Sequence, residues 1–296
     1  MMNYSDERDN TNEEAALPPF DKEEWVAQKK AEKEKAFDMI SQMSEIVSHD
    51  GERFQNCLKL MSRFGKYSVG NILLLEAQKP DAKRLADFKS WKEEHVSINK
   101  GETGILILEP GKEYTNKDGK KVVPINAKKV FDISQTSLPF AVEPYVKVDE
   151  KLLFRALIHN APCRFRFADP EDMPHGEIAR FSEADNAVYV VRGEDPENTF
   201  RWIAKELAAA HLRKADFDKD TADFVAVCVS YVLCERNRVD TAPYDFSKLP
   251  EGFAEMNEIQ VKGTLGKIRE VSNTITGDMQ KFIEQQKDAR SKDDAR

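Results

Sequence analysis

The chain has 296 residues, of which 40% are hydrophobic and 33% charged, with 13 glycines and 13 prolines. This composition is typical of a globular protein, and it excludes collagen-like, wholly disordered and disulfide-stapled chains. The formal net charge of −8 argues at first against a nucleic-acid-binding protein, because phosphate contacts need Lys and Arg.

The sequence also predicts neither a membrane-spanning helix nor an exported chain. The longest apolar run, residues 224–234, is about half the ~20 residues that a membrane helix needs, and the acidic first residues contain no apolar secretory core. The four cysteines form no Cys-x-x-Cys pair, so we expect free thiols in a reducing cytosol, with no disulfide and no zinc knuckle. We therefore expect a cytoplasmic protein.

The first half of the chain predicts helices followed by a small sheet. Residues 1–20 are acidic and polar and include Pro18-Pro19, so we expect a disordered tail. Apolar residues from Trp25 to Val47 form one stripe, which predicts a long amphipathic helix over 21–47. Shorter helices are predicted around 54–61, 71–78 and 88–91, and strands at 105–108, 122–123 and 129–133, with a hairpin turn at 117–120.

The second half predicts another mixture of helices and strands. Asp195-Pro196 is typical of a helix start, with an acidic cap and a proline in the first turn. That helix is expected to run to about Lys214, and the apolar helix after it to be buried. The expected elements are helices at 150–160, 195–214, 220–234 and 261–287, and strands at 163–167, 178–181 and 188–191.

The fold class predicted from these elements is α+β. We expect two domains, each with helices packed on a small, mostly antiparallel sheet, plus a helical C-terminal extension. The expected divisions are a tail at 1–20, a first domain at 21–136, a linker at 137–149, a second domain at 150–250, and a C-terminal helix with a charged tail at 251–296.

Positive charge is concentrated in the first domain. Residues 51–130 carry 16 Lys/Arg and 10 Asp/Glu, whereas both flanking segments are net acidic. Because charges act within a Debye length of about 8–10 Å, this local excess matters more than the total. It predicts a module that binds a polyanion, or else a solvated lysine-rich surface.

Several motifs in this basic segment point to one family. They are Tyr67-Ser68-x-x-Asn71, Gln78-x-Pro80-x-Ala82, Phe88-x-x-Trp91, Lys100-Gly101-Glu102-x-Gly104-Ile105, Pro110 and Phe131-Asp132. In this order they resemble the N-terminal single-stranded-DNA-binding domain of the ArdC-type antirestriction proteins carried by plasmids and conjugative elements. The resemblance covers roughly residues 21–136 and departs from the family at 95–98, where a more basic stretch is expected.

The residues themselves fit single-stranded DNA as the ligand. Single strands are held by cations that follow the phosphates and by flat side chains on which bases stack, at about 1–3 kcal/mol per base. An asparagine could also bond a base edge or a phosphate. The candidate binding residues are Arg63, Lys66, Tyr67, Asn71, Lys83, Arg84, Lys89, Trp91 and Lys100.

Structural alternatives exist for several of these residues. Trp91 could be a core residue, and Tyr67-Ser68 could begin a helix with Ser68 as its cap. Gly101 and Gly104 are expected to serve turn geometry. The functional interpretation is favoured for Arg63, Lys66 and Lys100, and only the whole set favours DNA.

In the same family the C-terminal domain resembles a zinc metallopeptidase with a His-Glu-x-x-His helix, whose histidines bind the metal and whose glutamate activates water. Here Lys205 and Ala209 stand at the two histidine positions, Glu206 is retained, and Asp223 stands at the third ligand position. A lysine ammonium repels a dication, so we expect no zinc, no cofactor and no catalytic residues. We expect instead that Lys205 pairs with Asp223 or Glu206.

The function that we predict is non-enzymatic binding of single-stranded DNA for a mobile element, during conjugation or in antirestriction, with an inactive peptidase-like domain. The alternatives are a protein-interaction module that uses the C-terminal domain, and a metal-dependent peptidase with other ligands. The expected partners are single-stranded DNA and a protein bound by the C-terminal domain, with no membrane and no small-molecule substrate.

Overall fold

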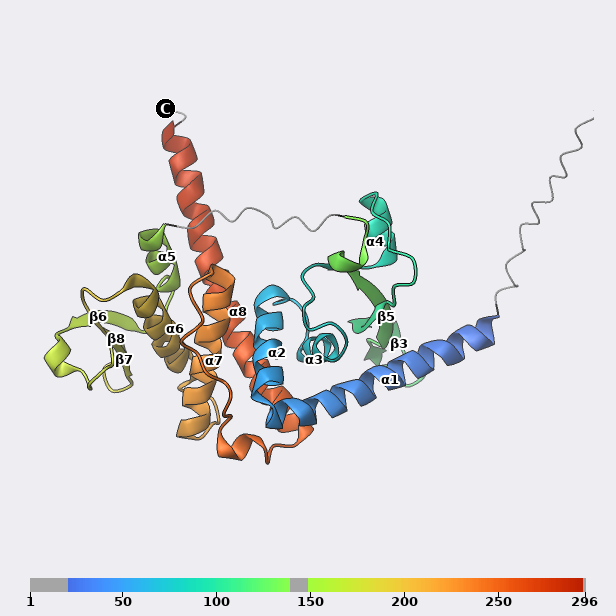
Figure 1. Ribbon diagram of the computed structural model, residues 1–296, viewed down its shortest axis with the longest axis horizontal. Coiled ribbons are helices and arrows are strands. Elements are labelled where there is room, and N and C mark those ends of the chain that lie inside the picture. Colours follow the sequence, from blue (N-terminus) through green and yellow to red (C-terminus); the bar gives the residue numbers. More distant parts are fainter. Residues whose placement is uncertain (1–20, 139–148, 295–296) are drawn as a thin grey trace, which may run out of the picture.

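The computed structural model describes residues 21–138 and 149–294. The tail expected at 1–20 and most of the linker expected at 137–149 lie outside these residues. The elements form an N-terminal lobe that carries one small sheet and a second lobe that carries another, with a group of long helices between them (Figure 1). The predicted α+β class is confirmed.

Four helices build the N-terminal lobe, and each begins where a side chain caps it. Helix α1 spans Lys22–His49 and α2 spans Gly51–Arg63, capped by aspartates at 21 and 50. Helix α3 spans Val69–Gln78. The Ser68 hydroxyl accepts a hydrogen bond from the Asn71 backbone N–H at 3.2 Å, which confirms Ser68 as its cap. The short α4 spans Phe88–Glu93.

The sheet of this lobe has the order β1-β5-β2 and is antiparallel. Strand β2 (Ile105–Pro110) pairs along its length with β5 (Ile125–Asp132), and the two-residue β1 (Leu85–Ala86) pairs with the end of β5. The hairpin predicted at 117–120 joins β3 (Tyr114–Thr115) to β4 (Lys121–Val122). Strands β1 and β3 were not predicted, because two residues carry no periodicity.

The second lobe contains helix α5 (Glu150–Leu157) and a mixed sheet of order β6-β8-β7. Strand β6 (Arg164–Ala168) runs parallel to β8 (Ala187–Val191), and β7 (Ala179–Ser182) runs antiparallel to it. Helices α6 (Pro196–Leu212) and α7 (Lys219–Asn237) follow, and Asp195 caps α6 as predicted.

The last helix is part of the core. Helix α8 spans Glu258–Asp294 and packs against α5, α7, α3 and α1. Val261, Leu265 and Ile268 are buried in a cluster that also contains buried residues of the N-terminal lobe. The C-terminal helix predicted as an extension therefore joins the two lobes (Figure 1).

A half-buried arginine ties the lobes together. Arg236 on α7 donates hydrogen bonds to the carbonyl oxygens of Met61 and Ser62, at the end of α2, at 2.9 and 3.3 Å. It also donates to Asn273 Oδ1 and Thr276 Oγ1 on α8, both at 2.7 Å. Burial, together with the nearby Arg269, lowers the pKa of Arg236 to about 10. The negative end of the α2 dipole favours a cation at this place.

Candidate functional site

Helix α3 closes the free edge of strand β2. Asn71 Nδ2 donates to the Leu108 carbonyl and Asn71 Oδ1 accepts from the Leu108 N–H, both at 2.8 Å. Two turns later, the amide of Gln78 makes the same exchange with Leu106, with both bonds at 2.9 Å. Asn71 is only 6% exposed. The prediction that it contacts DNA is therefore wrong, because its amide serves the sheet.

Trp91 is also a structural residue. Its side chain is 0% exposed, and its indole N–H donates to the Phe131 carbonyl at 3.0 Å. No base can stack on a ring that is wholly covered, so the prediction of Trp91 as a stacking plane is wrong. The structural alternative for this residue is confirmed.

The segment that carries Lys83 and Arg84 is fixed by a buried carboxylate. Asp132 Oδ1 accepts from the backbone N–H groups of Lys83 and Arg84 at 2.6 and 2.9 Å. These hydrogen bonds lower the pKa of Asp132 against the effect of its burial. Both cationic side chains remain exposed. Asp132 therefore fixes the backbone from which the side chains of Lys83 and Arg84 project.

Three predicted cations have no carboxylate partner among the described residues. Arg63, Lys66 and Lys100 are exposed, and Arg63 donates only to the Ala82 carbonyl, at 3.1 Å. Because Ala82 precedes Lys83, this contact brings Arg63 next to a second candidate. Gly101 has a positive φ of 90°, as the turn that presents Lys100 requires.

Two other predicted cations are already paired. Arg84 Nη2 lies 2.7 Å from Glu94 Oε1, and Lys89 Nζ lies 3.7 Å from Glu93 Oε1. In the free protein the charges of Arg84 and Lys89 are therefore partly offset by these carboxylates. Exposed pairs are worth only about 0–1 kcal/mol, so a phosphate can displace such a carboxylate at little cost.

The turn between α2 and α3 is held by helix α8. Asn273 Nδ2 donates to the Gly65 carbonyl at 2.8 Å, and Arg269 Nη2 donates to the Lys66 carbonyl at 3.3 Å. Tyr67 is half-buried edge-on against Phe64, and burial raises its pKa.

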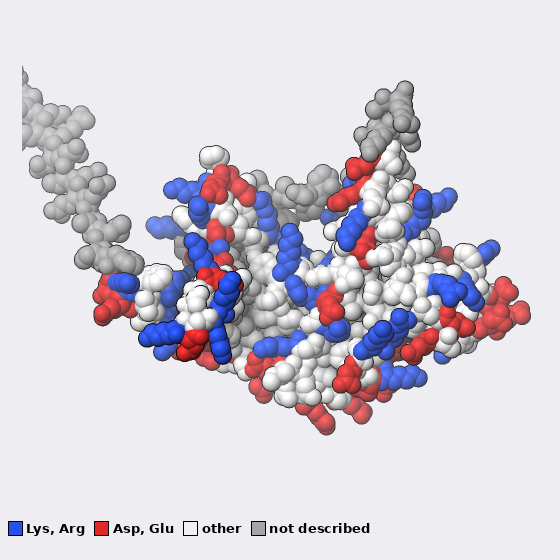
Figure 2. Space-filling view, turned by 180° about the vertical axis from the view of Figure 1, so that it is seen from behind, with Lys and Arg blue, Asp and Glu red and all other residues white. Residues whose placement is uncertain are grey.

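On the side shown in Figure 2 the molecule is hollowed between its lobes, and Lys and Arg side chains stand along the hollow.

The sequence interpretation missed an exposed aromatic ring. Phe88, at the start of α4, is 61% exposed. A helix of six residues can bury only one narrow face, and Trp91 occupies that face. The short length of this helix was the signal that could have shown that Trp91 and Phe88 are not both buried. Tyr114, on the β3–β4 hairpin, is a second ring with 53% exposure.

The ion pair that we expected in the second lobe is present. Lys205 Nζ, on α6, lies 3.5 Å from Glu206 Oε1 and 3.4 Å from Asp223 Oδ1, on α7. Glu206 Oε2 accepts the Phe181 backbone N–H of β7 at 2.8 Å, and burial raises the pKa of Glu206. Glu206 therefore interacts with the ammonium group of Lys205 and with the backbone of strand β7.

These residues do not fit a divalent metal. Lys205 places a positive charge between the two carboxylates, and Ala209 offers no ligand atom. Residues 21–138 and 149–294 contain no cluster of three His, Cys, Asp or Glu side chains arranged around a common point. Burial lowers the pKa of His211, and the negative charge of Asp278 on α8 acts in the opposite direction.

The comparison with known families decides the assignment. Residues 28–143 match the model of the N-terminal domain of anti-restriction factor ArdC. This part of the chain is ArdC-like. The matched residues include α2, α3, α4 and the first sheet, with every candidate binding residue described above.

Solved structures show the same fold. The antirestriction ArdC protein from the R388 plasmid, in its metal-free structure, superimposes with a TM-score of 0.51 over 73% of this chain and 86% of its own, at 15% identity. Its Mn(II)-bound structure gives 0.50 over 72% and 85%, at 13% identity. At these identities the likeness concerns the fold alone.

One curated relative is an uncharacterized protein of Bacillus anthracis, pXO2-81, which is 23% identical over 290 aligned positions. The alignment covers 78% of this chain and 48% of that protein. The ArdC-like chain thus spans about half the length of the curated relative that it matches.

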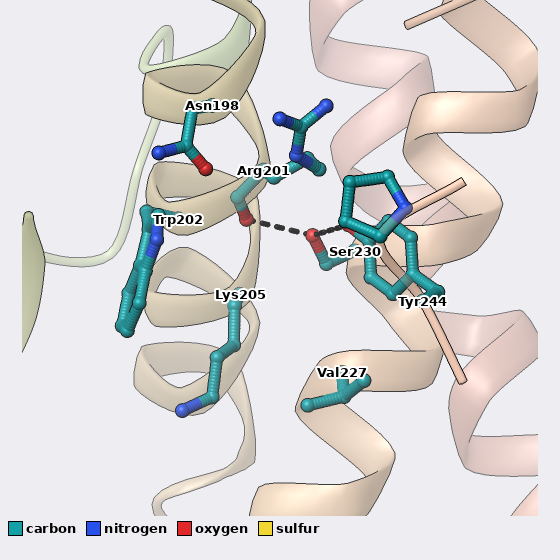
Figure 3. Close-up of a pocket in the computed structure, with 8 residues that line it drawn as sticks. Asn198, Arg201, Trp202, Lys205, Val227, Ser230 and Tyr244 are labelled. Carbon is teal, nitrogen blue, oxygen red and sulfur yellow. Dashed lines mark hydrogen bonds between the residues drawn. The ribbon is translucent and has the colours of Figure 1, made fainter. Parts of the chain in front are cut away.

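A small cavity lies beside Lys205 in the ArdC-like chain. It has a volume of about 230 Å³ and lies in the groove between α6 and α7 (Figure 3). Its lining includes Trp202 and Lys205 on α6, Ser230 on α7 and Tyr244, and the Ser230 hydroxyl lies 2.7 Å from that of Tyr244. Half of the eight residues that line it are aromatic or cationic. Within the described part of the chain, no helix is both long and apolar enough to cross a membrane.

Proposed function

We propose that this ArdC-like chain binds single-stranded DNA through its N-terminal lobe. The observation that carries the proposal is that Arg63, Lys66 and Lys100 are each exposed and form no salt bridge with a described carboxylate. They belong to a domain that matches the ArdC N-terminal family, in a chain whose net charge is −8. A local excess of cations on an acidic protein favours one polyanionic site.

Lys83 extends this site. It follows Ala82, whose carbonyl oxygen accepts from Arg63, and its backbone is fixed by Asp132. Arg84 follows Lys83 and is exposed, Lys89 can join once a phosphate replaces its carboxylate partner, and half-buried Tyr67 lies next to Lys66. The proposed binding residues are therefore Arg63, Lys66, Tyr67, Lys83, Arg84, Lys89 and Lys100.

We propose further that the second lobe performs no metal-dependent chemistry. The position of the first histidine in a His-Glu-x-x-His helix carries Lys205, whose ammonium contacts both remaining carboxylates. A water molecule cannot be activated where a lysine replaces the Lewis acid. This arrangement argues against the alternative of a metal-dependent peptidase.

The biological role that fits these features is antirestriction or escort of a transferred strand for a mobile element. It is supported by the ArdC N-terminal family match and by the fold shared with a plasmid antirestriction protein. Binding of a protein by the second lobe is the second candidate. Phe167, on the edge strand β6, is 66% exposed beside a cavity of about 490 Å³, with Arg192 only 3.8 Å from its ring centre.

One titration tests the main proposal. Fluorescence anisotropy with a labelled 20-nucleotide single strand and with the matching duplex, at fixed salt, should show tighter binding of the single strand. Zinc and manganese measured on the same gently purified sample should lie far below one equivalent. Equal or absent binding of both DNAs would overturn the DNA proposal, and one equivalent of metal would overturn the proposal of a metal-free second lobe.

A further inference from the structure

We propose that Arg84 and Phe88 together form the surface on which DNA bases stack. This inference rests on the proposed DNA-binding function and names the groups that contact the bases. It transfers the stacking role from the buried Trp91 to two exposed neighbours. Arg84 acts through its flat guanidinium group, and Phe88 through its ring.

Arg84 is held as an oriented plane. Its guanidinium carbon lies 4.9 Å from the centre of the Trp91 ring, and its Nη2 lies 2.7 Å from each oxygen of Glu94. Its backbone N–H is bound by Asp132. The side chain is nevertheless 51% exposed, so a flat cationic group is fixed from one side and open to solvent. Nucleic-acid bases stack on such guanidinium planes as they do on aromatic rings.

Phe88 belongs to the same short helix as Trp91, the ring on which Arg84 rests. It precedes Trp91 by three residues on α4, and side chains three apart on a helix are neighbours. Single exposed rings are common on protein surfaces and need no explanation by themselves. What distinguishes Phe88 is that its neighbour Trp91 carries a fixed guanidinium on its own ring. Helix α4 and the segment before it therefore offer two exposed groups on which bases can stack.

Trp91 and Glu94 have positioning roles in this arrangement. Trp91 is anchored by its hydrogen bond to the Phe131 carbonyl and supplies the surface on which Arg84 rests. Glu94 fixes the rotation of the guanidinium. A lysine in place of Arg84 would keep the charge but provide no plane.

The stacking surface is continuous with the proposed phosphate contacts. Arg63 donates to the Ala82 carbonyl, and Ala82 is two residues before Arg84. Two residues of extended chain span at most about 7 Å. A strand whose phosphates contact Arg63 and Lys83 would therefore bring its next bases to Arg84 and Phe88.

The test separates stacking from charge by comparing two probes. Wild type, Phe88→Ala and Arg84→Lys are titrated with labelled oligo(dT) of 15 nucleotides and with an abasic oligomer of the same length. On oligo(dT) each variant should bind about 5- to 100-fold more weakly, which corresponds to the loss of one stacked base. On the abasic oligomer all three proteins should bind alike, and the salt dependence should not change.

Two further variants control the result. Phe37→Ala removes an exposed ring that also has a cation near it, Lys33 at 6.0 Å, but on α1, and it should leave both affinities unchanged. Phe88→Trp should keep the affinity for oligo(dT), and the new indole fluorescence should be quenched on binding. Because Arg84 and Phe88 are exposed, all variants should fold, which circular dichroism checks.

The outcomes are distinguishable. If wild type binds oligo(dT) but Phe88→Ala and Arg84→Lys bind it equally well, the stacking surface is refuted while the DNA-binding proposal stands. Equal losses on oligo(dT) and on the abasic oligomer would make both residues phosphate contacts and would also refute stacking. If wild type binds neither probe, the proposed function itself fails.

Discussion

Asn71 and Leu108 exchange two hydrogen bonds of 2.8 Å, one from each side of the asparagine amide to the backbone of strand β2. Asn71, Gln78, Trp91 and Asp132 all belong to the motifs by which the sequence resembles its family, and all four bond to backbone groups. These four motif residues therefore maintain the fold, whereas other residues of the same motifs, such as Phe88 and Lys100, are exposed.

The Asn71 clamp predicts a large effect on stability. Asn71→Ala removes both hydrogen bonds and leaves a nearly buried peptide group unpaired, which should lower the free energy of unfolding by about 2–3 kcal/mol. Urea denaturation followed by circular dichroism measures this change. The affinity of the folded protein for DNA should not change, and a loss of affinity at unaltered stability would contradict the structural role.

Replacement of Arg236 should destabilise the protein at least as much as replacement of Asn71. Its guanidinium donates to groups on both α2 and α8, so Arg236→Met strands several buried carbonyl oxygens. We expect a loss of about 2–4 kcal/mol in the free energy of unfolding. Arg164→Met, at an exposed arginine on β6, should cost less than about 0.5 kcal/mol. Similar small losses for both variants would show that Arg236 does not tie the lobes together.

Asp87 predicts a specific acid sensitivity. Hydrogen bonds from Lys128 and from the Ser90 N–H lower the pKa of Asp87 from 3.8 to about 2. Because the folded-state pKa is depressed, this carboxylate stabilises the fold above pH 4, and its contribution disappears as the pH falls from 4 towards 2. Asp87→Asn keeps an oxygen to cap α4 but should flatten the stability curve in this window, by about 1 kcal/mol. An unchanged slope would contradict the proposed pairing.

The second lobe makes a prediction about regained metal binding. Wild type should bind no zinc tightly, whereas Lys205→His combined with Ala209→His places two imidazoles one helical turn apart, with Asp223 as a third ligand. Isothermal titration with zinc should detect one site in this double variant only. Zinc binding by wild type with the same stoichiometry would refute the view that Lys205 replaces the metal.

The sequence predicted most helices and the longer strands, because hydrophobic periodicity and caps such as Asp195 and Ser68 are local signals. It also predicted the ion pair of Lys205, which follows from the positions that Lys205, Glu206 and Asp223 occupy in the resemblance to a His-Glu-x-x-His site. It could not predict the role of Asn71, whose partner lies 37 residues away. The burial of Trp91 beside the exposure of Phe88 likewise depends on which face of α4 meets the sheet.

The salt dependence of single-strand binding tests the central proposal most directly. Each phosphate contact on a single strand contributes about −0.7 to the slope of log K against log salt. Replacement of Arg63, Lys66 and Lys100 by glutamine should make the slope shallower by about 2 and weaken binding to all sequences alike. Replacement of Lys151, Lys214 and Lys248, which are exposed on the second lobe, should leave the slope as in wild type. An unchanged slope in the first variant, or an equal change in both, would contradict a DNA site on the N-terminal lobe.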